Sequence, residues 1–200
     1  MGKPHRFHCV YAYIAVPGYS LCTLAAYLRF PGSFSPSHNW LSELGNPNQN
    51  PDGAIFYNLG IILTGLFVLL FFLGLSRWKI KNHKAQNRLV LLTQVFGALG
   101  SVALILSAVF PINHSQVHQV LSIGLYILLG TAFAFSATAL RYHPSVPKWV
   151  LAAGLFTAFV DILSGIFMEV TILEWLTVTL FLFYLMLLNL FTKKISRLVS

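Results

Sequence analysis

The sequence is poor in charge and especially poor in acids. Only 9% of its 200 residues are charged and only five are Asp or Glu, whereas about a quarter of the residues in a soluble domain are charged. The hydrophobic residues, 56% of the total, form long runs with almost no charge inside them. A run of about 20 apolar residues can cross a bilayer as a helix. The composition leaves no room for a soluble catalytic domain and predicts an integral membrane protein.

Cysteine is scarce as well, because the sequence contains only Cys9 and Cys22. Both lie in the first apolar run, where a helix would hold them ~20 Å apart. A disulfide needs Cα atoms within about 7 Å, so no bond between them is expected. The end of this run lacks the small residues of a signal-peptide cleavage site, and we therefore expect it to stay as a helix.

Six apolar runs predict an all-α, polytopic fold with six transmembrane helices. The helices are expected at about 8–30, 54–76, 89–110, 117–140, 148–168 and 171–192. The third and fifth runs carry closely spaced small residues, which let helices approach one another in lipid. These include Gly97, Gly100, Gly154 and Gly165. We therefore expect one compact bundle, a single domain over residues 1–200.

The positive charges are sorted along the chain, and this sorting predicts orientation. Of the thirteen Lys and Arg residues, all but Arg29 lie near the two termini or in every second gap between runs. Basic segments stay on the cytoplasmic side of a membrane. We therefore expect both termini in the cytoplasm, and loop 31–53, His114 and His118 on the non-cytoplasmic side of the cell (plasma) membrane.

The net charge of +8 is accounted for by these same basic gaps. Basic residues beside a membrane orient the protein and attract anionic lipid headgroups. Membrane lipids are therefore the expected partners, and no nucleic acid is expected.

Loop 31–53 is the most distinctive segment between the runs. It opens and closes with Pro, Gly and Asn residues that favour turns. Between them, His38 to Leu44 is expected to form a short helical turn on the membrane surface, with Trp40, Leu41 and Leu44 facing the bilayer.

This loop also carries a family resemblance. Ser42-Glu43-Leu44-Gly45, the Asn and Pro residues that follow, and Ala54–Gly60 resemble the signature of the domain of unknown function 998 family. Phe110-Pro111 and the His just after them extend the match. The resemblance implies a six-helix integral membrane protein and no established reaction or cofactor.

The loop pattern is also similar to that of the DRAM and GPI-remodelling membrane proteins. For those relatives the implied theme is membrane lipids. This sequence has Glu43 where they often have Asp, so the resemblance implies the shape of the loop and no role for a residue.

His114 and His118 are spaced i and i+4, so both project from one helix face. The same spacing lets two imidazoles bind one divalent metal ion. The zinc-protease motif is absent because Ser115 stands where that motif has Glu. Two interpretations stay open: a metal site, or two interfacial His residues hydrogen bonded to the first loop. A metal would need further ligands from the same side, such as His38, Glu43 and Asp52.

Asp161 is the one acid inside an apolar run. It is expected ~18 Å along its helix and ~12 Å below the outer surface. A carboxylate at such a depth costs about 3 kcal/mol unless it is paired or hydrated, so it should face the interior, beside Thr157, Ser164 and Gly165. It could carry a proton, bind a cation or headgroup, or act as a catalytic acid. Alternatively, it is held by a hydrogen bond from another helix.

Three further polar residues have simpler expectations. Glu169 and Glu174 flank the last outer turn and are expected to be solvated. Gln94 is expected to make a hydrogen bond between helices.

Side and depth together predict one outward-opening polar pocket. The candidate catalytic residues are Asp161, Glu43 and His118. The full set of candidate ligand-binding residues is His38, Ser42, Glu43, Asn58, His114, His118, Ser122 and Asp161.

Three functions fit this prediction, and whether the protein is an enzyme stays open. The first is a protein that binds or handles a membrane lipid through the pocket. The second is a membrane hydrolase in which His114 and His118 hold a metal and Glu43 or Asp161 is the acid or base. The third is an accessory subunit or assembly factor whose small-residue faces bind another membrane subunit. A proton pathway ranks last, since the inner half offers Asp161 few partners.

Overall fold

The computed structural model describes residues 10–167 and 170–199, with side chains described up to residue 195. Within these residues the secondary structure is helical and contains no strand, which confirms the predicted all-α class. Six long helices and three short 3-10 helices follow one another in the order α1 (Tyr11–Tyr27), η2 (Leu41–Gly45), α2 (Ala54–Leu73), η3 (Gly74–Trp78), α3 (Lys84–Val109), η4 (Ile112–His114), α4 (Ser115–Leu140), α5 (Lys148–Ile166) and α6 (Thr171–Val199).

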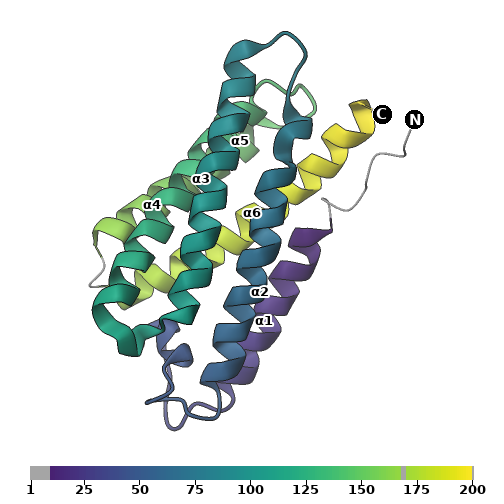
Figure 1. The fold of residues 1–200 in the computed structure, drawn as a ribbon. Coiled ribbons are helices and arrows are strands. Elements are labelled where there is room, and N and C mark those ends of the chain that lie inside the picture. The colour runs from purple at the N-terminus through teal and green to yellow at the C-terminus, as the bar shows by residue number, and fades with distance from the viewer. Residues whose placement is uncertain (1–9, 168–169, 200) are drawn as a thin grey trace.

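Helices α1 to α5 pack mainly against their neighbours in sequence (Figure 1). Helix α6 crosses them obliquely and contacts α5, α1 and the 3-10 helices η2 and η3. The start of α1 and the end of α6 lie toward the same end of the molecule (Figure 1). Most of the described Lys and Arg residues belong to this end, which we call the basic end; they are Arg77, Lys79, Lys81, Lys84, Arg88, Arg141, Lys148, Lys193 and Lys194.

Among the described residues, five helical segments are long and apolar enough to cross a membrane. They are Ala54–Trp78, Lys84–Val109, Ile112–Leu140, Lys148–Ile166 and Thr171–Ile195. Helix α1 is shorter, with 17 residues, and contains Pro17.

The outer surface is apolar, unlike that of a soluble protein, and several polar side chains lie within the apolar core. Large apolar side chains such as Leu21 and Phe159 are exposed, whereas Ser136 and Asn189 are completely buried. Apolar groups on the outside and polar groups inside suit a lipid solvent, in which polar side chains face the bundle interior. The chain is a multi-pass membrane protein.

The observed helix ends differ from the predicted ones in several places. Helix α1 ends at Tyr27, three residues before the predicted end at 30, and residues 8–9 lie outside the described part. Helix α3 begins at Lys84 rather than 89, because the side chain of His83 accepts a hydrogen bond from the Gln86 N–H and caps the helix. Helix α6 extends to Val199, beyond the predicted end at 192.

The small residues of the third and fifth runs lie at internal contacts. A Cβ atom added to Gly97 would overlap the ring of Phe72, and one added to Gly154 would overlap the hydroxyl of Tyr184. The predicted compact packing is therefore present. These helix faces are filled within the chain, which removes the feature on which the accessory-subunit hypothesis depended.

Polar side chains join the helices at the basic end. Trp78 is fully buried and its indole Nε1 donates to Thr192 Oγ1 over 3.0 Å. The Trp78 carbonyl accepts from Gln86 Nε2 at 2.7 Å and from His143 Nε2 at 2.8 Å. Nearby, Gln94 Nε2 donates to the Leu73 carbonyl at 2.8 Å, which confirms the predicted hydrogen bond between helices.

His143 should make the stability of the protein depend on pH. Burial lowers the pKa of His143 below its usual 6.5, although its hydrogen bond to the Trp78 carbonyl opposes this shift. The unfolded chain therefore binds the proton more readily than the folded one, so stability is constant above about pH 6.5 and falls as the pH decreases below it. Thermal unfolding measured from about pH 8 to about pH 5, a range that brackets the usual His pKa, should show a smaller acid loss of stability in His143→Gln than in the wild type. Equal losses would contradict this role.

Candidate functional site

Loop 31–53 closes the end of the bundle opposite the basic end. Its centre is the 3-10 helix η2, in which Leu41, Ser42 and Leu44 are buried. Glu43 Oε1 accepts from the Trp40 N–H at 3.3 Å, and Glu43 Oε2 accepts from Asn39 Nδ2 at 2.8 Å. The predicted helical turn is present, but Leu41 and Leu44 pack into the bundle instead of facing the bilayer.

Two asparagine side chains attach the loop to the first two helices. Asn50 is completely buried, and its Nδ2 donates to the carbonyls of Ala26 and Leu44 at 3.1 and 2.9 Å. Asn58 Nδ2 donates to the Gly45 carbonyl at 2.9 Å. These contacts fix η2 between the end of α1 and the start of α2.

Three side chains of α6 attach the loop from the opposite side, among them Thr171, whose Oγ1 donates to the Pro36 carbonyl at 3.1 Å. The Ser42 N–H donates to Glu174 Oε1 at 3.2 Å, and the Trp175 indole donates to the Asn39 carbonyl at 3.0 Å. The loop therefore connects the first and the last helices of the chain.

Gly45 is expected to be essential for this docking. A Cβ atom at this position would overlap Asn58 Oδ1 and lie 2.8 Å from Tyr57 Cδ1. Gly45→Ala should therefore destabilise the protein by about 1–3 kcal/mol, the usual cost of overpacking. Gly124→Ala is the matched control, because nothing lies within 4 Å of its added Cβ. Thermal unfolding of the two variants tests the expectation, and similar melting temperatures would contradict it.

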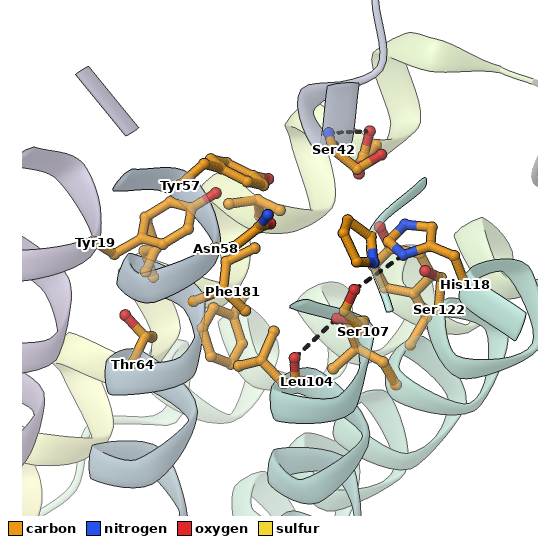
Figure 2. Close-up of a pocket in the computed structure, with 17 residues that line it drawn as sticks. Tyr19, Ser42, Tyr57, Asn58, Thr64, Leu104, Ser107, His118, Ser122 and Phe181 are labelled. Carbon is orange, nitrogen blue, oxygen red and sulfur yellow. Dashed lines mark hydrogen bonds between the residues drawn. The ribbon is translucent and has the colours of Figure 1, made fainter. Parts of the chain in front are cut away.

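A polar pocket lies beneath the docked loop. It has two adjoining compartments, of about 60 and 190 Å³. Five residues line both compartments: Ser42, His118, Ser122, Tyr126 and Glu174. Figure 2 shows Tyr19 and Tyr57 on one side of the smaller compartment, His118, Ser122 and Ser107 on the other, and Ser42 above.

One face of α4 presents a row of polar groups to this pocket. His118, Ser122 and Tyr126 are spaced four residues apart, so they lie above one another on the helix. His118 Nδ1 lies 3.0 Å from the Ser107 carbonyl and 2.9 Å from the Phe110 carbonyl. Because a carbonyl only accepts, Nδ1 carries a proton, and Nε2 can accept a hydrogen bond when the ring is in its neutral form.

The rest of this row has free hydrogen-bonding capacity. Within the described residues, His118 Nε2 and the hydroxyls of Ser122 and Tyr126 have no hydrogen-bond partner. Polar groups in a membrane protein normally find partners. The α4 face can therefore bind a ligand with both donors and acceptors.

Glu174 faces this row from α6. It lines both compartments, and both of its oxygens lie near the Ser42 N–H, at 3.2 and 3.4 Å. The predicted position, solvated at an outer turn, was wrong, because Glu174 lines the pocket. An available signal was its position in the first turn of α6, where a carboxylate is stabilised by the helix dipole.

The structure brings together half of the predicted site residues and places the others elsewhere. Ser42, Asn58, His118 and Ser122 line the pocket.

The other predicted residues lie outside the pocket. Glu43 caps η2, and the exposed His38 bonds to Ser35 and Ser37 of its own loop. His114 is exposed beside the ring of Phe110, with ring centroids 6.1 Å apart. Asp52 is exposed, and Glu169 lies outside the described residues.

Asp161 faces the bundle interior, as its predicted depth required, but does not line the pocket. It is 1% exposed and packs against Gly130 of α4. Its Oδ1 atom is buried with no hydrogen-bond partner among the described residues. Ser164 on the same helix has a partner, since its hydroxyl lies 2.6 Å from Thr177 Oγ1.

The possible metal ligands do not converge. The described residues contain no group of three His, Cys, Asp or Glu side chains that could hold a metal ion. His118 Nδ1 donates to the Ser107 carbonyl in α3 and to the Phe110 carbonyl directly after α3. His114 instead lies in the exposed turn η4. The second interpretation, two interfacial His residues without a metal, therefore describes the structure better than a metal site. It needs one change, because His118 bonds to the end of α3 and not to the first loop.

Comparison with known proteins gives one result. A family model described as "Protein of unknown function (DUF998)" matches residues 13–191. No curated protein and no solved structure matches the chain. The similarity to the DRAM and GPI-remodelling group is thus without support from any of these comparisons.

Proposed function

We propose that this chain, which belongs to the DUF998 family, binds a membrane lipid whose headgroup enters the pocket beneath loop 31–53. The observation that carries the proposal is the row His118, Ser122 and Tyr126, which has free hydrogen-bonding capacity and lies in the same pocket as Glu174. Ligand sites commonly combine a few such polar groups with an apolar surround.

The larger compartment has the apolar surround that a lipid requires. Four apolar residues line it: Ile112 of η4, Phe167 just after α5, Val170 just before α6, and Leu173 in the first turn of α6. Phe167 and Val170 are 55% and 45% exposed, so they are accessible to lipid. A volume of about 190 Å³ is below the ~300 Å³ of a drug-sized site. The pocket thus suits a headgroup, with the acyl chains remaining in the bilayer.

The proposal includes an orientation. Helix α1 would be the sixth span, both termini would be cytoplasmic, and the pocket would open on the non-cytoplasmic side of the plasma membrane. The basic end supports this orientation, because Lys and Arg near the ends of spans stay in the cytoplasm. The hydrolase alternative gains no support from the placement of its proposed metal ligands.

Native mass spectrometry of the purified full chain tests lipid binding. Ser122→Phe should fill the pocket and reduce the amount of bound lipid about tenfold, equivalent to about 1.4 kcal/mol. Ser20→Phe is the control, because Ser20 is an exposed residue on α1. Thermal unfolding must show that both variants are folded. Equal lipid occupancy in both variants, or no lipid on the wild type, would overturn the proposal.

A further inference from the structure

We infer that the headgroup bound in this pocket carries a primary ammonium group, as in a phosphoethanolamine lipid, and that Glu174 selects it. This inference rests on the proposed function and adds the chemical class of the ligand.

The charges around the pocket favour a cationic group. Glu174 is the one carboxylate among the described lining residues, and no Lys or Arg lines either compartment. An anionic headgroup would therefore meet a carboxylate without a neutralising side chain. A partly buried carboxylate is stabilised by an opposite charge, which an ammonium group would supply.

The protein's own nearest candidate cation is already engaged. Arg29 is the single Lys or Arg between residues 10 and 76, and it follows the end of α1. Its guanidinium donates to the Ala25 carbonyl at 2.8 Å and lies 4.4 Å from the centre of the Phe56 ring. Arg29 thus does not line the pocket, and Glu174 has no ion pair with it.

The hydrogen-bonding groups favour a primary amine over a quaternary one. A primary ammonium has three N–H donors, whereas trimethylammonium has none. The pocket offers two acceptors for such donors: the Glu174 carboxylate, which retains lone pairs beside its contact with the Ser42 N–H, and Nε2 of His118. A choline headgroup would donate no hydrogen bond to either acceptor.

The rest of the α4 row suits the phosphate that accompanies the amine. The free hydroxyls of Ser122 and Tyr126 lie one and two turns from His118, about 5.4 Å per turn. Hydroxyls can donate to phosphate oxygens without adding charge. The pocket thus presents acceptors near its loop and donors deeper along α4, which matches an ammonium group joined to a phosphate.

A lipid competition experiment on the purified full chain tests this inference. The protein is mixed with equal amounts of phosphatidylethanolamine, phosphatidylcholine and phosphatidylglycerol of the same acyl chains, and bound lipids are identified by native mass spectrometry. The wild type should prefer phosphatidylethanolamine by about tenfold, and Glu174→Gln should lose this preference while still binding lipid.

Glu43→Gln is the matched control, because Glu43 is a carboxylate of η2, next to Ser42, but caps η2 outside the pocket, a role that Gln can also fill. It should keep the preference of the wild type. Lipid binding without headgroup preference, or an unchanged preference in Glu174→Gln, would overturn the inference and leave the proposed function standing. Absence of any bound lipid would instead overturn the proposed function and the inference with it.

Discussion

Replacing Trp78 with alanine should lower the free energy of unfolding by about 3–5 kcal/mol, the usual cost of truncating a buried aromatic residue. Trp78 is completely buried at the end of η3. Its indole donates to Thr192 of α6, so the variant would lose both packing and a hydrogen bond between distant parts of the chain. Thr192 would keep its own bond to the Leu188 carbonyl, at 2.7 Å, so the main loss is that of packed volume.

Trp149→Ala is the control for this measurement. Trp149 lies in the first turn of α5, at the same basic end of the bundle, but it is 53% exposed. Its removal should change stability by less than about 1 kcal/mol, because little packed volume is lost. Denaturation in mixed micelles would measure both variants. A similar cost for the two would show that Trp78 does not join η3 to α6 as described.

Asn50→Asp should release loop 31–53 from the bundle. The substitution keeps the size of the side chain but replaces the donor that serves the Ala26 and Leu44 carbonyls with an acceptor. Two buried carbonyls would lose their donor and face a carboxylate. Each unsatisfied buried group costs about 1–3 kcal/mol, so the loop should undock. Amide hydrogen exchange should then rise across η2 by about a hundredfold or more, as 1.4 kcal/mol corresponds to a factor of ten.

Asn48→Asp provides the matched comparison. Asn48 is exposed in the same loop, and its side chain makes no hydrogen bond within the described residues. Exchange in η2 should stay at the wild-type rate. If Asn50→Asp left η2 equally protected, the two bonds of Asn50 could not be what holds the loop.

Much of the fold could be predicted from the sequence because a bilayer imposes simple rules. Apolar runs long enough to span a bilayer predicted the position of each long helix, and closely spaced small residues predicted close packing between helices. Helix ends were less predictable where one side chain decides them, as His83 does for α3. The length of α6 was missed because its final turns are polar and basic rather than apolar.

The site was less predictable, because side and depth do not specify which neighbours meet. Asp161 was expected in the pocket, yet α5 turns it toward Gly130 of α4. Glu174 was expected in solvent, yet the loop folds inward and places the Ser42 N–H against it. Both outcomes depend on contacts between segments far apart in the sequence, which no local pattern reports.

The hydrogen bonds between loop 31–53 and α6 also imply an order of assembly. The chain is synthesised from its N-terminus, so the loop is made long before Glu174 and Trp175 exist. Until then the Ser42 N–H and the Asn39 carbonyl lack the partners that they have in the complete bundle. The pocket is therefore incomplete until α6 has been made, and a chain that stops before α6 lacks one wall of it.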